Sequence, residues 1–338
     1  MGSLKSKLFD TMEISDAKEA KIPKLYVPVE EFQFHGPLED DTSNGLFLND
    51  VYFPEEIIIK ILTFLPPEQL LPLSLVCKKW CNIIKSDSFW MDVYNNQFPN
   101  KAKRLPWYVY YLYYSTDDFR NLLKNGNGQE GFKHWTILKN FGDEFIIEPV
   151  PKGSDPLPEG VPEFCGRKSC FTTSFYECCK IQVIRLENKR LLRYVINKFK
   201  PHIYVSEWYA GRFDCGCEYK LTIKGLASES MQKPMEDEDL EIEYDRMEYH
   251  RTEGDEIVLF SLLKPAIIPQ WEGKEWNKME ITVDEYESKT LKTLVFQHEG
   301  VDTQFWKGHY GSKMAGGVVK FLFESIQPIE EHIEEPCD

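Results

Sequence analysis

The most informative stretch of this chain runs from residue 53 to residue 90 and reads FPEEIIIKILTFLPPEQLLPLSLVCKKWCNIIKSDSFW. Pro54 is a favoured first residue of a helix, and the two glutamates after it lie where the helix dipole favours negative charge. Apolar residues then recur at helical spacing, namely Ile57, Ile58, Ile61, Leu62 and Leu65. The pair Pro66-Pro67 cannot continue a helix, so the pattern predicts one helix that begins at Pro54 and ends before this pair.

Two further helical segments are predicted after the proline pair. In the second segment, one stripe collects the apolar side chains and leaves Lys78 and Lys79 facing outward. The residues of that stripe are Leu73, Val76, Cys77, Trp80 and Ile84. A third short element carries Phe89, Trp90 and Met91. Residues 50–95 are therefore expected to form a three-helix unit.

This helical unit is too apolar to be stable by itself. More than half of the residues between Asp50 and Met91 are apolar. Three short helices cannot bury so much apolar surface against one another. The surplus must be covered by another protein, because a large exposed apolar patch would lead to aggregation. The sequence therefore predicts a partner surface on these helices.

The same stretch resembles the F-box family closely. The matching blocks are Phe53-Pro54-Glu55-Glu56-Ile57, Ile61-Leu62-Thr63-Phe64-Leu65-Pro66-Pro67, Leu70-Leu71, Ser74-Leu75-Val76-Cys77-Lys78-Lys79-Trp80 and Ser88-Phe89-Trp90. The resemblance implies docking onto the Skp adaptor of a Skp–cullin–F-box ubiquitin ligase. The residues that it assigns to the contact or to its support are Pro54, Ile57, Ile61, Leu65, Leu75, Val76 and Trp80. An ordinary helical core is the alternative for some of them, and Cys77 and Ile84 are expected to be internal.

From Phe132 onward the sequence changes to short alternating runs that are typical of strands. The predicted strands are Gln182–Leu186, Ile203–Tyr209, Glu218–Lys224, Glu256–Leu262, Lys278–Val283, Thr293–Glu299 and Val318–Phe323. One helix, Lys189–Lys198, interrupts them and is ended by Pro201. Because most of these runs have no helix between them, they indicate an antiparallel β-sandwich.

The predicted architecture is an α+β multidomain chain with an N-terminal three-helix F-box and a jelly-roll-like antiparallel β-sandwich. The expected parts are a disordered N-terminal segment at 1–49, the F-box at 50–95, a linker at 96–130, the sandwich at 131–326 and an acidic tail at 327–338. The aromatic run from Trp107 to Tyr114 is interpreted as core or as a packing linker. The stretch 229–256 holds twelve acidic residues against three basic ones and is expected to be a solvated loop.

Residues 115–324 resemble the F-box-associated domain of the sugar-recognising F-box proteins. The matching blocks are Phe119-Arg120-Asn121-Leu122-Leu123, Ser174-Phe175-Tyr176-Glu177-Cys178, Gln182-Val183-Ile184, Pro201, Trp208-Tyr209-Ala210-Gly211-Arg212-Phe213-Asp214-Cys215-Gly216-Cys217 and Phe305-Trp306-Lys307-Gly308-His309-Tyr310-Gly311. In that family the domain is a ten-stranded β-sandwich. Some members bind the inner N-acetylglucosamine pair of high-mannose N-glycans, and so mark misfolded glycoproteins exported from the endoplasmic reticulum for degradation.

The resemblance also implies which residues hold the sugar. Trp306 would stack on a sugar ring, while Phe305 and Phe175 would pack on the ring and the acetamide. Asp214 would accept hydrogen bonds from hydroxyl groups, and Lys307 would donate them. The residues alone leave alternatives open: Phe175 as a core residue of a strand, and Asp214 as a turn-capping residue. The glycan-binding members carry Tyr where this chain has Phe305, so one hydroxyl donor is lost.

Composition excludes several other functions. The net charge of −15 argues against nucleic acid as a partner, because a phosphate backbone would be repelled. The nine cysteines form no pair of C-x-x-C knuckles, so neither a zinc site nor a cofactor is predicted. Gly126-Asn127-Gly128-Gln129-Glu130-Gly131 spells G-x-G-x-x-G, but it follows the helix-like run Phe119–Asn125 rather than a strand, and it is interpreted as a turn.

The expected function is that of a non-catalytic substrate-recognition subunit, with N-glycosylated misfolded proteins, the Skp adaptor and the cullin scaffold as partners. The alternative is an F-box adaptor that recognises a glycan-independent protein degron. The N-terminus lacks a hydrophobic signal segment, so a cytoplasmic location is expected, including the cytosolic face of the endoplasmic reticulum. Met1–Ser6 also matches the pattern for N-myristoylation at Gly2, with a chance match as the alternative. A single acyl chain would give at most weak peripheral association with a membrane.

Overall fold

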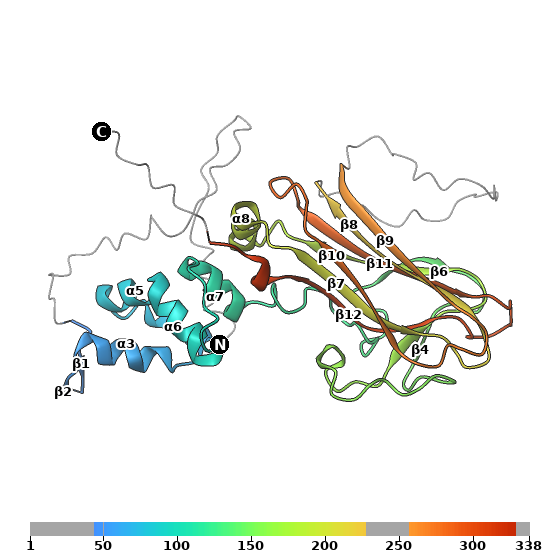
Figure 1. The fold of residues 1–338 in the computed structure, drawn as a ribbon, viewed down its shortest axis with the longest axis horizontal. Helices are drawn as coiled ribbons and strands as arrows, with labels where there is room; N and C mark the ends of the chain where they lie inside the picture. Colours follow the sequence, from blue (N-terminus) through green and yellow to red (C-terminus); the bar gives the residue numbers. More distant parts are fainter. Residues whose placement is uncertain (1–43, 50, 228–256, 329–338) are drawn as a thin grey trace. The chain divides into compact units, whose positions relative to one another are not determined.

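The computed structural model describes residues 44–49, 51–227 and 257–328 (Figure 1). Helices occupy the N-terminal part, and two β-sheets follow. Gly2, the acidic stretch 229–256 and most of the tail at 327–338 lie outside the described residues. The expectations of lipidation, of a solvated acidic loop and of an acidic tail therefore stay predictions.

The first predicted helix is confirmed as α3 (Glu55–Thr63). Pro54 is its N-cap, one position earlier than the first helical residue, and the two glutamates lie in its first turn. Ile58 and Leu62, four residues apart, are buried on one face of the helix. Ile57 and Ile61, each one residue earlier, are exposed. The apolar residues of α3 therefore divide into a buried stripe and an exposed stripe.

The second predicted helix is wrong in detail, because two helices occupy its place. They are α4 (Pro67–Leu73) and α5 (Lys78–Ile84). Cys77 ends the break between them: its backbone is extended, and its Sγ accepts a hydrogen bond from the backbone N–H of Trp80 at 3.5 Å. Short polar side chains compete in this way with the helical backbone, and apolar spacing alone does not reveal it. The predicted stripe from Leu73 to Ile84 is therefore not one helical face.

The third predicted element is longer than expected. It is α6 (Asp87–Gln97), capped by Ser86, whose Oγ accepts a hydrogen bond from the N–H of Phe89 at 3.4 Å. A further short hairpin, β1 (Phe47–Leu48) with β2 (Val51–Tyr52), precedes α3, although the sequence predicted no structure before residue 50.

The aromatic run from Trp107 to Tyr114 forms a helix, α7 (Trp107–Ser115), which confirms its interpretation as a packing element. Its Tyr113 ring lies 4.6 Å from Phe323 in the 3-10 turn η2 (Phe323–Ser325), centroid to centroid. Tyr94 of α6 lies 5.3 Å from the same phenylalanine. The aromatic residues of α6 and α7 therefore share one packing cluster with the 3-10 turn that follows the last strand.

The predicted antiparallel sandwich is confirmed. The described residues form two five-stranded sheets in addition to the hairpin. The first sheet has the order β10 (Asn277–Val283), β7 (Ile203–Ala210), β12 (Lys313–Phe321), β5 (Cys170–Thr172), β4 (Ile146–Glu148). The second has the order β3 (Thr136–Asn140), β6 (Cys178–Arg185), β11 (Thr293–Asp302), β8 (Cys217–Leu226), β9 (Val258–Ile268).

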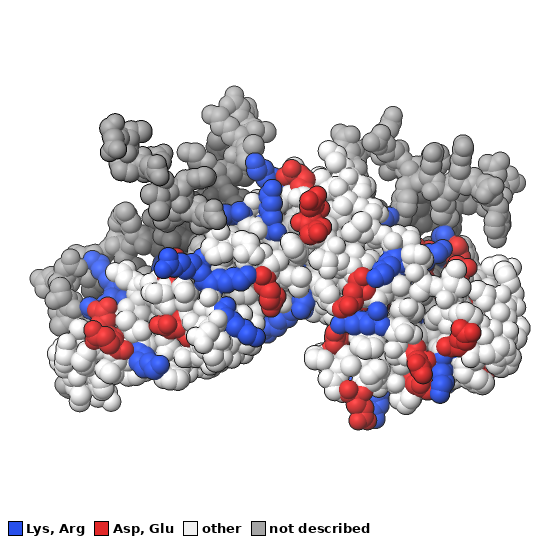
Figure 2. Space-filling view, in the orientation of Figure 1, with Lys and Arg blue, Asp and Glu red and all other residues white. Residues whose placement is uncertain are grey.

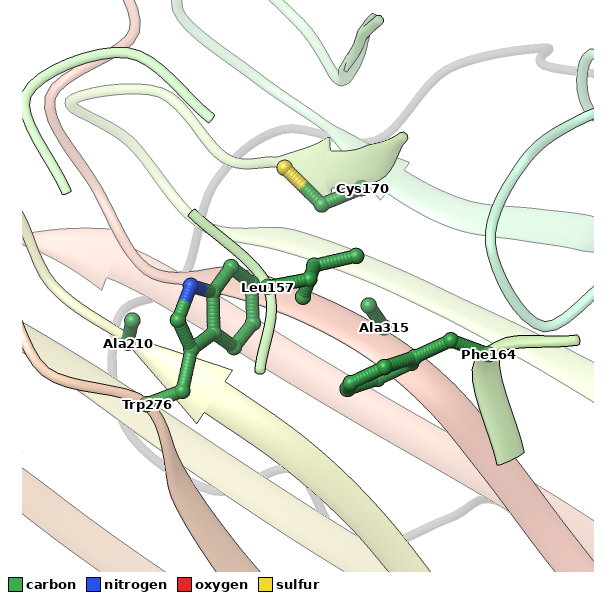
Figure 3. Packing of buried hydrophobic residues seen from close by; sticks show 6 residues of the cluster. All are labelled: Leu157, Phe164, Cys170, Ala210, Trp276 and Ala315. Atoms are coloured by element: carbon green, nitrogen blue, oxygen red, sulfur yellow. The ribbon is translucent and has the colours of Figure 1, made fainter. Parts of the chain in front are cut away.

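All seven predicted strands are present, with shifted ends, and the predicted helix is α8 (Arg190–Phe199). The short strands β3, β4 and β5 were not predicted, because three to five residues give too few alternations to recognise. One apolar cluster of the sandwich contains the six side chains drawn in Figure 3. They are Leu157, Phe164, Cys170, Ala210, Trp276 and Ala315, and the half-buried Trp208 packs against them as a core residue.

The segment Phe119–Asn125 is not a helix, which corrects the sequence interpretation. It runs instead beside β12: the N–H of Leu122 donates to the carbonyl of Val319 at 2.7 Å, and the N–H of Val319 donates to Oδ1 of Asn121 at 3.0 Å. The G-x-G-x-x-G sequence after it is a series of turns, as predicted. A side chain at Gly126 would lie 3.1 Å from the backbone nitrogen of Gly317, so this glycine permits close backbone packing.

Candidate ligand and partner surfaces

Three loops meet at one end of the sandwich and carry the predicted sugar-binding residues. They are the β5–β6 loop (173–177), the β7–β8 loop (211–216) and the β11–β12 loop (303–312). The N–H of Asp302 donates to the carbonyl of Ser174 at 3.1 Å, and the N–H of Thr303 donates to the carbonyl of Gly216 at 3.0 Å. These backbone bonds hold the three loops together.

The β11–β12 loop turns sharply and presents two aromatic rings. Oδ1 of the buried Asp302 accepts hydrogen bonds from the N–H groups of Gln304, at 3.0 Å, and Phe305, at 2.6 Å. Phe305 has a φ of 55°, an uncommon left-handed conformation for a bulky residue. It is 65% exposed, and Trp306 beside it is 39% exposed. Asp302 therefore fixes a strained turn that holds both rings at the surface.

The two other loops are joined to these rings by side-chain contacts. The Phe305 ring meets Tyr176 edge to face at 5.6 Å, and Tyr176 lies 5.1 Å from Phe175. Phe175 is half-buried in a loop, so the alternative that it is a core residue of a strand is wrong. These three aromatic residues thus form one group on two loops.

Trp306, the neighbour of Phe305 in the sequence, is connected to Asp214 by side-chain contacts through Tyr310 and Arg212. The Trp306 ring lies 5.8 Å from Tyr310, and the Arg212 guanidinium lies 4.6 Å from the Tyr310 ring centroid. Nε of Arg212 donates to Oδ1 of Asp214 at 2.7 Å. The Asp214 side chain is therefore half of an ion pair, rather than the turn cap that the sequence left open. Lys307 is exposed next to Trp306.

Sequence reasoning missed three residues of this surface: Tyr176, Arg212 and Tyr310. Each is within four positions of a predicted residue, but the sequence does not reveal which neighbouring side chains turn outward. Further exposed aromatic residues on loops are Phe141, Phe213 and Trp271. Figure 2 shows basic and acidic side chains interspersed on one face of the molecule, without a large patch of either sign.

A buried polar cluster lies between the sheets, at residues that the sequence did not single out. Oε2 of Glu207 accepts hydrogen bonds from Tyr219, at 2.5 Å, and from Nδ1 of His298, at 2.7 Å. Nε2 of His298 contacts the amine of Lys180, and Trp135 stacks on the imidazole at 4.8 Å. Burial lowers the pKa of His298 to about 4 and lowers the pKa of Lys180 well below its usual value. The buried imidazole is therefore neutral at pH 7.

The predicted adaptor residues lie on α3, on α5 and on the segments that flank these two helices. Pro54, Ile57, Ile61, Leu75 and Val76 are exposed, with 45% of Ile57 and 60% of Val76 accessible. Leu65 and Trp80 are half-buried. Cys77 and Ile84 are buried, as predicted. The exposed aliphatic side chains among them come from α3 and from the α4–α5 break, so they contribute to the apolar surface of the F-box segment.

Two further properties of the described residues concern metal binding and membrane-spanning helices. None of their groups of His, Cys, Asp and Glu is arranged to hold a metal ion. No helix within 44–49, 51–227 and 257–328 combines the length and the hydropathy that a membrane span requires.

Family models match both parts of the chain. The F-box-like model matches residues 52–96, and the model of the F-box associated region matches residues 113–243 and 251–321. This chain belongs to the F-box proteins with an F-box associated region. The match agrees with the two parts seen in the structure, helices first and a sandwich after them.

Curated members of this F-box family resemble the chain along most of their length. F-box only protein 6 of Mus musculus is 31% identical over 273 residues, which cover 79% of this chain and 81% of that protein. F-box only protein 44 of Homo sapiens is 28% identical over 271 residues, with 79% and 94% covered. Among solved structures, TmCBM61 in complex with β-1,4-galactotriose has a TM-score of 0.31 and 12% identity, covering 60% of this chain and 99% of that one. That likeness is too low to bear on the ligand.

Proposed function

We propose that this F-box protein is the non-catalytic substrate-recognition subunit of a Skp–cullin–F-box ubiquitin ligase, acting on misfolded N-glycosylated proteins in the cytoplasm, including the cytosolic face of the endoplasmic reticulum. The F-box docks the Skp adaptor, and the F-box associated region binds the chitobiose core of the glycan. The single observation that supports glycan binding is the exposure of Phe305 and Trp306 on a loop whose turn is stabilised by Asp302.

The chemistry of a sugar suits this surface. A pyranose ring has an apolar face of C–H groups, which the exposed Trp306 ring can cover. Its hydroxyl and acetamide groups need donors and acceptors, which Lys307, Tyr176 and the Arg212–Asp214 pair supply nearby. Because Asp214 is already paired with Arg212, a sugar hydroxyl would bind an ion pair rather than a free carboxylate. The phenol of Tyr176, which contacts Phe305, offers a hydroxyl group where Phe305 itself has none.

The glycan-binding half is tested by titrating the full chain with chitobiose. Trp306→Ala should weaken binding by about 1 to 3 kcal/mol, or roughly fivefold to 150-fold, because it removes a stacking ring. Trp271→Ala is the matched control, since Trp271 is a second exposed tryptophan outside the contacts described above. If the unmodified chain has no affinity for chitobiose, the glycan-independent protein degron becomes the better explanation of the sandwich.

The adaptor-binding half is tested by Leu75→Asp in a pull-down with the Skp adaptor. Leu75 is exposed, so the free chain should tolerate the aspartate, whereas burial of that charge in the interface should abolish the complex. Circular dichroism and thermal unfolding check that the variant is folded. Retention of adaptor binding by the folded Leu75→Asp chain would exclude the α4–α5 break from the interface.

N-myristoylation at Gly2 and the weak membrane association that it would give also belong to this proposal. Gly2 lies outside the described residues, so the sequence match alone supports it. Intact-mass measurement of the chain co-expressed with a myristoyltransferase, with Gly2→Ala as the control, tests it directly.

A further inference from the structure

The β1–β2 hairpin before α3 exposes a cluster of large apolar side chains. Phe47 is 51% exposed, and Val51 and Tyr52 are each 55% exposed. The rings of Phe47 and Tyr52, which are register partners across the two strands, meet at 5.5 Å. Two strands of two residues cannot bury these groups by themselves. The hairpin therefore presents an apolar surface that belongs neither to the predicted adaptor residues nor to the predicted sugar-binding residues.

The hairpin is fixed to the F-box by specific contacts. Nε1 of Trp80 donates a hydrogen bond to the carbonyl of Gly45 at 2.7 Å, and the N–H of Phe53 donates to the carbonyl of Leu46 at 2.7 Å. Leu46 is buried. Gly45 has a φ of 89°, and a Cβ there would lie 2.5 Å from Sγ of Cys77. Only glycine fits that position, so the fold is built to hold the hairpin against the start of α5.

The exposed side chains of the hairpin continue directly into the surface assigned to the adaptor. Tyr52 is two residues before Pro54, and Ile57 follows one helical turn later. Among the described residues from 44 to 137, every exposed large apolar side chain lies between positions 47 and 76. They are Phe47, Val51, Tyr52, Ile57, Ile61, Phe64, Leu75 and Val76. Trp80, assigned to the adaptor contact or its support, is the residue that anchors the hairpin.

We propose that the β1–β2 hairpin extends the adaptor interface, with Phe47 and Tyr52 packing on an apolar surface of the same Skp-type adaptor that covers α3 and the α4–α5 break. This inference rests on the proposed adaptor docking. Its occupant is the adaptor rather than a separate protein, because the hairpin is continuous in sequence with α3 and is anchored by Trp80. Large aromatic side chains at such positions are frequent energetic centres of interfaces.

The test compares the affinity of full-length variants for the Skp adaptor by calorimetry. Phe47→Ser with Tyr52→Ser should weaken binding by roughly tenfold to a hundredfold, because two interface rings are removed. Phe141→Ser is the matched control: Phe141 is similarly exposed, at 57%, but lies in the β3–β4 turn of the sandwich. Ile57→Asp is the reference variant for loss of adaptor docking, since Ile57 lies on α3.

A photo-crosslinking amino acid at position 47 gives a second measurement that does not depend on stability. It should label the adaptor, whereas the same group at position 141 should not. If the hairpin variant binds as well as the unmodified chain and position 47 labels nothing, while Ile57→Asp abolishes binding, the hairpin inference is overturned and the adaptor docking stands. If the unmodified chain does not bind the adaptor, both fall together.

Discussion

At the scale of single residues, the proposed sugar-binding residues coincide with backbone strain in the β11–β12 loop. Phe305 adopts a left-handed backbone conformation that costs free energy, and Asp302 stabilises it through two backbone hydrogen bonds. The predicted binding residues Trp306 and Phe305 could be named from the sequence, because the matching block carries them. Their contacts with Tyr176 and Tyr310 could not, because neighbouring residues of a loop do not reveal which way they turn.

The buried cluster around His298 makes the stability of the sandwich depend on pH. Burial lowers the pKa of the folded imidazole from 6.5 to about 4. Between those values the unfolded chain binds a proton at this imidazole that the folded chain does not, so the contribution of His298 to stability is full above pH 6.5 and falls as the pH falls towards 4. The loss contributed by His298 is on the order of 3 kcal/mol at most.

This dependence is measured by urea unfolding of the full chain between pH 7.5 and pH 5, where most carboxylates stay ionised. His298→Gln should be less stable at every pH but should lose most of the decline over that range. His134→Gln is the control, since His134 is exposed. An unchanged decline in the His298 variant would show that another buried group causes it.

At the scale of elements, apolar spacing predicted the helices and strands but not their ends. The second predicted helix is interrupted between Leu73 and Lys78, and Cys77 caps the start of α5 by a local hydrogen bond that periodicity does not reveal. The strands β3, β4 and β5 are too short to show alternation. The hairpin at 47–52 was missed because a two-residue strand gives no pattern at all.

The cap of α6 offers a test at this scale. Ser86→Ala removes the side-chain oxygen that accepts from the N–H of Phe89, and should lower the free energy of unfolding by about 0.5 to 2 kcal/mol. Gln97→Ala is the control, because Gln97 is exposed in the same helix and does not cap its N-terminus. Chemical denaturation of both variants gives the comparison. Equal effects of the two substitutions would contradict the capping role.

At the scale of the whole molecule, the chain carries two surfaces of different chemistry. The F-box segment exposes aliphatic side chains on α3 and at the α4–α5 break, while the sandwich exposes aromatic rings beside an ion pair on its loops. The first surface follows from composition, because too many apolar residues fall in too short a stretch. The second depends on a family resemblance, since the composition of the sandwich alone does not distinguish a binding loop from a core strand.

The most direct measurement of the central claim uses immobilised chitobiose as the capture surface for the purified Skp adaptor. The account predicts that the adaptor is retained only when the full chain is added, and that free chitobiose releases it. Trp306→Ala should prevent capture by weakening the glycan contact, and Leu75→Asp should prevent it by disrupting the adaptor contact. Capture of the adaptor that persists with Trp306→Ala, or no capture with the unmodified chain, would contradict it.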